Sequence, residues 1–99
     1  MNIIRDLRIA NNLKQKEVAK YLSYSKSSYS DTEIKGTVNI HIYVLLSYLY
    51  DVNIAYLLGL TKHIVHLTEE EKLNIKIKYK VDNHLKEKIG NINYEIRKS

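Results

Sequence analysis

LKQKEVAKYLSYSKSSYSDTE, residues 13–33, contains two short helical patterns separated by a four-residue break. In the first pattern Val18 and Leu22 lie four positions apart, so they share one face of a helix. The break covers residues 23–26, where Ser25 suits the cap of the second helix because its hydroxyl can accept from an amide of the next turn. Helices this short do not persist alone in water, so we expect both to pack on the rest of the chain.

The relation between these two helices predicts a helix-turn-helix. Ala19 in the first helix is small, as is needed where a second helix crosses closely. A short helix held across another at a steep angle, with its start exposed, fits the major groove of double-stranded DNA. The stretch therefore predicts a DNA-binding element.

Three further segments predict the helices against which this motif packs. Residues 3–12 carry apolar side chains at helical spacing and end at two asparagines, which tolerate the left-handed conformation. Residues 39–51 are apolar nearly all round, which is typical of a helix central to the core or shared with a partner subunit. Their β-branched residues and tyrosines also permit a strand, but the length and the flanking breaks favour a helix. A short helix at 54–58, ended by Gly59, completes an all-α, five-helix domain over residues 1–61.

The composition becomes more polar towards the C-terminus, so we place a linker at residues 62–67 and a separate segment at 68–99. Thr68 and Glu71 match a capping box, which marks the start of a helix. The segment is therefore expected to be a C-terminal helical extension that dimerises or binds a partner.

Two interpretations of the middle of this extension compete. Residues 73–81 alternate strictly between apolar and polar side chains, which is a strand signature. The same residues begin a helical stripe with spacing four, formed by Leu73, Ile77, Val81, Leu85 and Ile89 and continued by Ile92 and Ile96. The capping box and the length of the stripe favour helix, with breaks near Asp82–Asn83 and at Gly90.

The charge of the chain favours an anionic partner without identifying one. The net charge is +5 at neutral pH. Residues 1–61 carry seven Lys/Arg against five Asp/Glu, and residues 62–99 carry nine against six, so the N-terminal part is no more basic than the C-terminal part. Charge alone therefore does not identify nucleic acid as the binding partner.

The expected location follows from what the sequence lacks. There is no cysteine, which excludes a disulfide framework and a thiolate metal site. Charges interrupt residues 1–10, where a signal peptide needs an apolar core. The longest uncharged run, residues 36–50, has 15 residues, fewer than the roughly 18–20 that span a bilayer. We expect a cytoplasmic protein without membrane association.

Four pieces of the chain occur in the order, and at nearly the spacing, of one known family. They are LRIANNLKQKEVAKYL (7–22), SYSKSSYS (23–30), Glu33 and LYDVNIAYLLGL (49–60). On these pieces, residues 3–61 resemble the DNA-binding domain of the lambda-repressor/Cro (Xre-type) helix-turn-helix regulators. The resemblance implies a homodimeric transcriptional repressor that binds a palindromic operator in double-stranded DNA.

The chain departs from that family at the turn and in one loop. Ser23 stands where the family usually has glycine, because the backbone there has a positive φ, and serine costs up to about 1 kcal/mol in that conformation. Thr32 stands where a larger apolar residue is usual, and the loop between Glu33 and Ile40 is one residue short of the common form. These departures affect loop geometry and leave the expected fold unchanged.

The resemblance assigns DNA contacts to residues on and beside the second helix of the motif. The matching positions are Gln15, Lys26, Ser27, Ser28 and Asp31, flanked by Lys14, Lys16 and Lys35. Lys26 can donate to guanine O6 or N7, and Asp31 can accept from cytosine N4. Gln15 matches a position that donates to a phosphate. For each of these residues the alternative interpretation is a solvated surface side chain.

Other residues are expected to hold the protein together. The resemblance pairs Arg8 with Glu33, which would fix the second helix of the motif to the scaffold. The tyrosines at positions 43, 48, 50 and 56 are interpreted either as core or as a dimer interface, where one end of the ring stays wet. The candidates for a dimer interface are Tyr48, Tyr56, Leu85 and Ile89.

Nothing in the sequence predicts catalysis, a metal or a cofactor. His63 and His66 are three positions apart, but without cysteine or an adjacent carboxylate we interpret them as loop histidines. The chain contains no nucleophile–base spacing, glycine-rich phosphate loop or carboxylate pair in an apolar setting.

A protein-interaction module is the competing hypothesis. The chain would then be a helix-turn-helix scaffold, such as an antitoxin or an anti-repressor partner, whose residues 68–99 bind another protein while DNA binding is weak. The serine-rich second helix of the motif and the modest charge of residues 1–61 favour this alternative.

Overall fold

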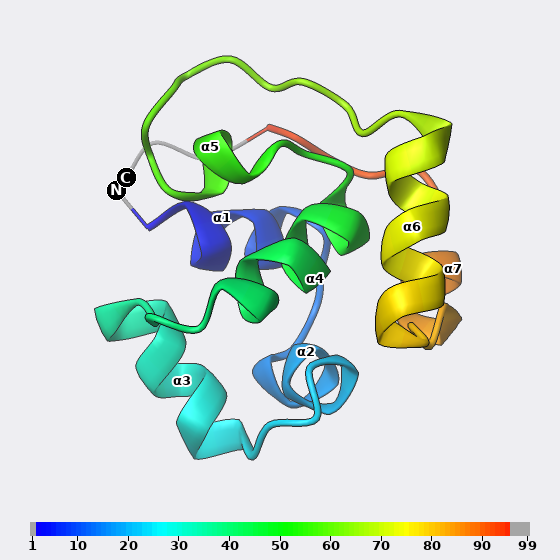
Figure 1. Cartoon of the computed structure of the whole chain (residues 1–99). Coiled ribbons are helices and arrows are strands. Elements are labelled where there is room, and N and C mark those ends of the chain that lie inside the picture. The colour runs from blue at the N-terminus through cyan, green and yellow to red at the C-terminus, as the bar shows by residue number, and fades with distance from the viewer. Residues whose placement is uncertain (1, 96–99) are drawn as a thin grey trace.

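Residues 2–95 are described by the structure, a computed structural model, and in this range the chain forms seven α-helices and no strand (Figure 1). The helices are α1 (Ile3–Ala10), α2 (Gln15–Tyr21), α3 (Lys26–Lys35), α4 (Ile40–Tyr50), α5 (Ile54–Leu57), α6 (Glu69–Tyr79) and α7 (His84–Ile89). The all-α prediction is confirmed, and the strand interpretation of residues 73–81 is wrong because α6 covers most of that stretch. None of the described helices has both the length and the apolar character needed to cross a bilayer.

The turn between α2 and α3 has the geometry that the sequence predicted. Ser23 has a φ of +59°, in the left-handed region. The Tyr24 amide donates to the carbonyl of buried Ala19 at 2.8 Å, which fixes the turn. Ser25 caps α3, since its Oγ accepts from the Ser28 amide at 3.1 Å. The start of α3 is therefore held at a defined position beside α2.

Ser23→Gly is expected to raise the free energy of unfolding by about 0.5–1 kcal/mol. The reason is that glycine adopts a positive φ without the clash that the serine Cβ makes. Urea denaturation of both proteins measures the difference. Ser30→Gly, the same change inside α3, is the matched control and is expected to lower stability by up to about 1 kcal/mol. A destabilised Ser23→Gly variant would contradict the positive φ.

α4 forms the centre of the core, with α1, α2 and α5 around it (Figure 1). Leu46 and Leu49 on α4 are fully buried. The tyrosines for which the sequence allowed either core or interface, Tyr43, Tyr48, Tyr50 and Tyr56, are all buried within this chain. The helix that is apolar nearly all round thus occupies the core, where most of its side chains are buried and only its first turn is exposed.

The C-terminal segment packs onto the N-terminal helices. α6 contacts α4, and α7 contacts both α2 and α4 (Figure 1). Leu85 on α7 is 8% exposed and belongs to the same hydrophobic core as the α4 side chains. One core therefore includes residues from both sides of the predicted linker at 62–67.

The break within the C-terminal segment lies close to the predicted position. Lys80 has a φ of +49° and ends α6, and α7 begins at His84. The break thus includes the predicted Asp82–Asn83. Gly90 has a φ of +65° and ends α7, at the position where the sequence predicted a second break.

The predicted apolar stripe is divided between two surfaces at the predicted break between α6 and α7. Leu73 and Ile77 on α6 face solvent and are 56% and 67% exposed. Leu85 and Ile89 on α7 pack against the core. The left-handed residue between the helices changes the direction of the chain, so the spacing of four no longer defines one face. Ile92 follows α7 outside any helix, and Ile96 lies outside the described residues.

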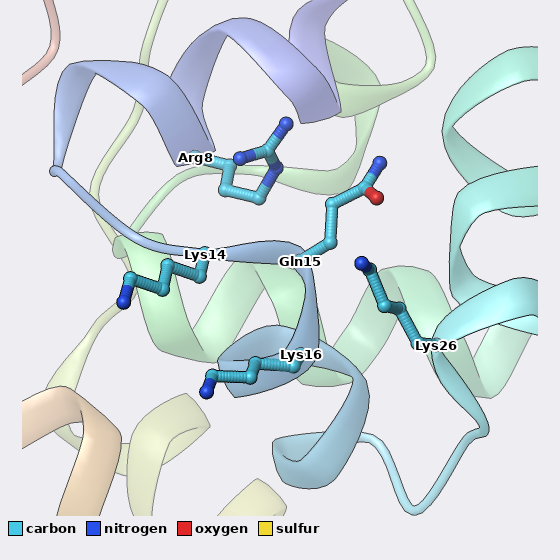
Figure 2. A pocket seen from close by; sticks show the side chains of 5 residues that line it. All are labelled: Arg8, Lys14, Gln15, Lys16 and Lys26. Atoms are coloured by element: carbon cyan, nitrogen blue, oxygen red, sulfur yellow. The ribbon is translucent and has the colours of Figure 1, made fainter.

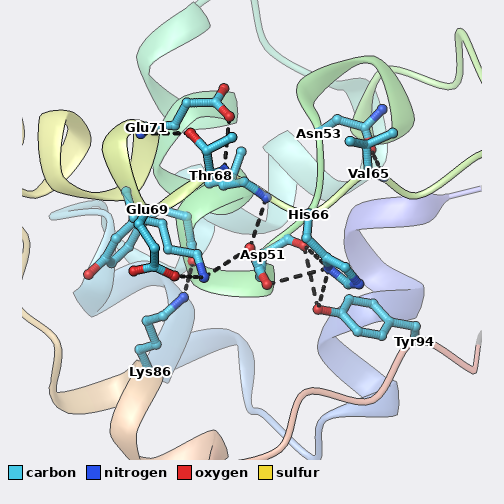
Figure 3. Close-up of polar contacts among 12 residues, drawn as sticks. Asp51, Asn53, Val65, His66, Thr68, Glu69, Glu71, Lys86 and Tyr94 are labelled. Atoms are coloured by element: carbon cyan, nitrogen blue, oxygen red, sulfur yellow. Dashed lines mark hydrogen bonds and ion pairs between the residues drawn. The ribbon is translucent and has the colours of Figure 1, made fainter.

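The turn after α4 holds the segment that leads from α5 to α6 (Figure 3). Asp51 Oδ1 accepts from the Leu67 amide at 3.0 Å, and Asn53 Oδ1 accepts from the Val65 amide at 2.8 Å. Asp51 Oδ1 also lies 3.6 Å from Nζ of Lys72 on α6. These contacts fix where α6 starts.

Leu85→Ala is expected to lower the free energy of unfolding by about 2–4 kcal/mol, because it leaves a cavity where α7 meets α2 and α4. Chemical denaturation measures the loss. Leu60→Ala is the matched control, since Leu60 is 77% exposed, and it is expected to change stability by less than about 0.5 kcal/mol. Equal stabilities for the two variants would mean that α7 does not contribute to the core.

Candidate nucleic-acid interface

A buried ion pair joins α1 to the end of α3. Arg8 Nε donates to Glu33 Oε2 at 2.6 Å, and Arg8 Nη2 donates to Glu33 Oε1 at 3.3 Å. Arg8 Nη1 also donates to the Leu13 carbonyl at 2.9 Å. The side chain of Arg8 is 13% exposed and that of Glu33 is 2% exposed. The structure thus brings together the two residues that the sequence paired, in the two-point geometry that orients a guanidinium strongly.

Two further side chains complete the bonding of Glu33. Gln15 Nε2, at the start of α2, donates to Glu33 Oε1 at 3.0 Å. Asn2 Nδ2 donates to the Glu33 carbonyl. Burial raises the pKa of Glu33, but its polar neighbours, with the Arg8 hydrogen bond as the largest opposing cause, outweigh burial and hold the pKa below its usual range. The carboxylate therefore stays ionised and ties α1, α2 and α3 together.

α3 is divided into an anchored face and a free face. Tyr29, Thr32 and Glu33 are buried, and Thr32 Oγ1 donates to the Ser28 carbonyl at 3.1 Å. Thr32, which replaces a larger apolar residue, thus satisfies its hydroxyl within the helix. The opposite face is exposed at Lys26, Ser27, Ser28 and Asp31, all of which the sequence proposed for DNA contact.

Basic side chains from α1 and from the starts of α2 and α3 surround a shallow depression (Figure 2). Its lining residues are Arg8, Lys14, Gln15, Lys16 and Lys26. Figure 2 shows Lys26 reaching from the start of α3 towards Gln15 at the start of α2. Because Arg8 is already paired with Glu33, the three lysines are the cations of this depression that remain for a ligand. They make the opening suitable for a phosphate group.

A second depression lies along α3 and shares Gln15 and Lys26 with the first. Ser27, Ser30 and Asp31 complete its lining. Ser30 was missed by the sequence reasoning, although its spacing of four from Lys26 on a helix could have identified it. The predicted residues Ser28 and Lys35 are exposed but line neither depression.

The C-terminal segment alters the charge beside this face, which the sequence did not indicate. Lys88 on α7 forms an ion pair with Glu17 on α2. The hydrogen bond from Lys88 is the main cause of a lowered pKa at Glu17. An acidic side chain next to Lys14 and Lys16 is thus neutralised by α7.

The four candidates for a dimer interface lie inside the fold. Tyr48, Tyr56 and Leu85 are buried, and Ile89 is half-buried against the same core. Tyr48 also donates to Asn83 Oδ1 at 2.9 Å, within the same chain. Three of the four thus have almost no surface left for another molecule, and Ile89 retains only part of its own.

The histidines proposed as loop residues are on the segment between α5 and α6. His66 Nδ1 lies 3.4 Å from Asp51 Oδ2 and close to the Tyr94 hydroxyl (Figure 3). His63 is exposed. Among residues 2–95, no group of three or more histidine or acidic side chains is arranged to hold a metal ion.

Comparison with known families gives one match. The sequence profile described as helix-turn-helix matches residues 4–57, more than half of the chain and all of α2 and α3. Comparisons with curated proteins and with solved structures gave no match.

Proposed function

This chain belongs to the Xre (lambda-repressor-type) helix-turn-helix family, a family of DNA-binding regulators, and on that premise we propose that it is a sequence-specific transcriptional repressor. It acts as a homodimer on a palindromic operator in the cytoplasm. Each subunit places the exposed face of α3 in the major groove of one half-site, with half-sites about one helical turn apart.

The observation that carries the proposal is the group of lysines around the starts of α2 and α3. Lys14, Lys16 and Lys26 line one depression, and a surface of this kind binds the phosphate backbone. Lys26 also lines the depression along α3, so it is the residue that reads base edges, by donating to guanine. Ser27 and Asp31 lie beside it and supply an uncharged and an acidic contact.

Gln15 combines a structural and a binding role in this proposal. Its Nε2 donates one hydrogen to Glu33, and an amide nitrogen carries two. The second hydrogen remains for a phosphate oxygen. The contact is therefore held in place by the Arg8–Glu33 pair, which lowers the entropic cost of ordering the side chain on DNA.

A protein-interaction module remains the second candidate. The observation that favours it is the free apolar surface on α6, where Leu73 and Ile77 are exposed. In that case DNA binding is secondary, and the C-terminal segment contacts the partner.

Selection of bound sequences from random duplex DNA, at near-physiological salt, tests the proposal. Enrichment of one palindrome supports a dimeric, sequence-specific regulator. Enrichment of a single half-site supports specific binding without the dimer. No enrichment, together with a co-purifying protein that is lost in a folded Leu73→Glu variant, supports the interaction module and overturns the proposal.

A further inference from the structure

The outward face of α6 carries an unusual arrangement of apolar and charged side chains. Glu70, Leu73, Ile77 and Lys80 are spaced three, four and three apart, so they form one stripe along the helix, and all four are exposed. The residues that turn towards the core are Lys72, Ile75 and Tyr79, which are half-buried. The stripe thus lies on the side of α6 that no other described part of the chain covers.

The stripe is complementary to itself when a second copy is turned by 180°. A two-fold axis beside the middle of α6 places Leu73 opposite Ile77 of the second copy, and Ile77 opposite its Leu73. The same axis places Glu70 opposite Lys80, again twice. Such an interface is isologous, because each contact occurs twice with the partners exchanged.

The charged residues of the stripe favour one of the two possible arrangements of the paired helices, parallel or antiparallel. In the antiparallel pair Glu70 of each copy meets Lys80 of the other. In a parallel pair Glu70 would meet Glu70 and Lys80 would meet Lys80. Like charges placed opposite each other are unfavourable, so the sequence of α6 favours the antiparallel pair.

We propose that the exposed stripe of α6 is the dimer interface of this protein and that it binds α6 of a second copy in the antiparallel direction. The proposal deepens the dimeric part of the proposed function, on which it rests. It replaces the earlier candidates Tyr48, Tyr56 and Leu85, which are buried in one chain, and Ile89, which is partly buried against its core. One face of an 11-residue helix is smaller than the roughly 800 Å² per partner of a standard stable interface. The free dimer is therefore weak, and binding to two adjacent half-sites strengthens it by raising the local concentration.

Sedimentation equilibrium of the full chain without DNA, at concentrations up to about 1 mM, tests the interface. We expect a reversible monomer–dimer equilibrium. Leu73→Glu is expected to weaken it by at least about 30-fold, because it places two carboxylates in the apolar centre. Leu60→Glu, a matched change at another exposed leucine, is expected to leave it unchanged. Circular dichroism confirms that each variant is folded.

Charge reversal tests the direction of the helices. Glu70→Lys and Lys80→Glu are each expected to weaken the dimer by about 5- to 20-fold, since each reverses two exposed pairs. Combining both changes in one chain restores Glu–Lys pairs in the antiparallel dimer and is expected to restore association.

Three results would overturn the inference: a monomer at every concentration, a dimer insensitive to Leu73→Glu, or a double variant as weak as the single ones. Because the measurement contains no DNA, these results leave the proposal of DNA binding intact. If the protein still dimerises through α6 but selects no DNA sequence, the dimer interface stands and the proposal of specific DNA binding fails.

Discussion

Replacing Glu33 by alanine is expected to lower the free energy of unfolding by about 3–5 kcal/mol, the range found when one partner of a buried ion pair is removed. Arg8 would lose both hydrogen bonds from its guanidinium to the carboxylate while remaining largely buried. Gln15 would lose the acceptor of its Nε2 as well. The loss is large because one carboxylate serves donors from two other helices. Urea denaturation at neutral pH measures it.

A double replacement distinguishes the contribution of the two charges from the contribution of the volume that the Arg8 and Glu33 side chains fill. Arg8→Met combined with Glu33→Leu removes both charges and keeps much of the volume, so we expect it to be more stable than Glu33→Ala alone. A cost below about 1 kcal/mol for Glu33→Ala would indicate a pair that water screens, as at an exposed site. That result would contradict the burial of Arg8 and Glu33.

The helix-turn-helix could be predicted because its determinants are local. Ser25 caps the helix that directly follows it, and the turn at Ser23 is set by the backbone conformation of one residue. The Arg8–Glu33 pair spans 25 positions and has no local signal, so it was available only through the family resemblance. Such a resemblance transfers contacts that periodicity cannot reveal.

The position of the C-terminal segment could not be predicted in the same way. A spacing of four joins Leu73, Ile77, Leu85 and Ile89 into one stripe only if the helix is continuous. Lys80 in the left-handed conformation breaks it, and few sequence patterns mark a lysine in that role. Which half of the stripe is buried then depends on α4 and α2. Leu85 and Ile89, the two dimer candidates that belong to this stripe, lie on its buried half.

The packing of α7 against α2 changes the charge beside the proposed DNA-binding face. Lys88 reaches Glu17 from a helix 71 positions away along the chain, and it neutralises an acidic group beside two lysines of the depression. The C-terminal segment therefore contributes to the charge of the face that we propose to bind DNA. This links the two parts of the chain that the sequence had separated at residues 62–67.

Lys26→Ala is expected to reduce affinity for the selected operator by roughly 10- to 100-fold, which corresponds to about 1–3 kcal/mol for one direct base contact. Lys26 is exposed and lines both depressions, so its removal should leave folding unchanged while taking away the cation common to them. Fluorescence anisotropy with labelled duplexes measures the affinity at several salt concentrations.

Comparison with Lys16→Ala and Lys62→Ala distinguishes base reading from charge. Lys16 lines only the first depression, so Lys16→Ala should weaken operator and unrelated DNA equally and reduce the salt dependence by about one released ion. Lys62, exposed on the segment before α6, should have no effect. For Lys26→Ala the loss should be greater on the operator than on unrelated DNA, because a base contact exists only on the correct sequence. Equal losses on both would assign Lys26 to the phosphate backbone, and recognition would then depend on Ser27, Asp31 and the shape of the DNA.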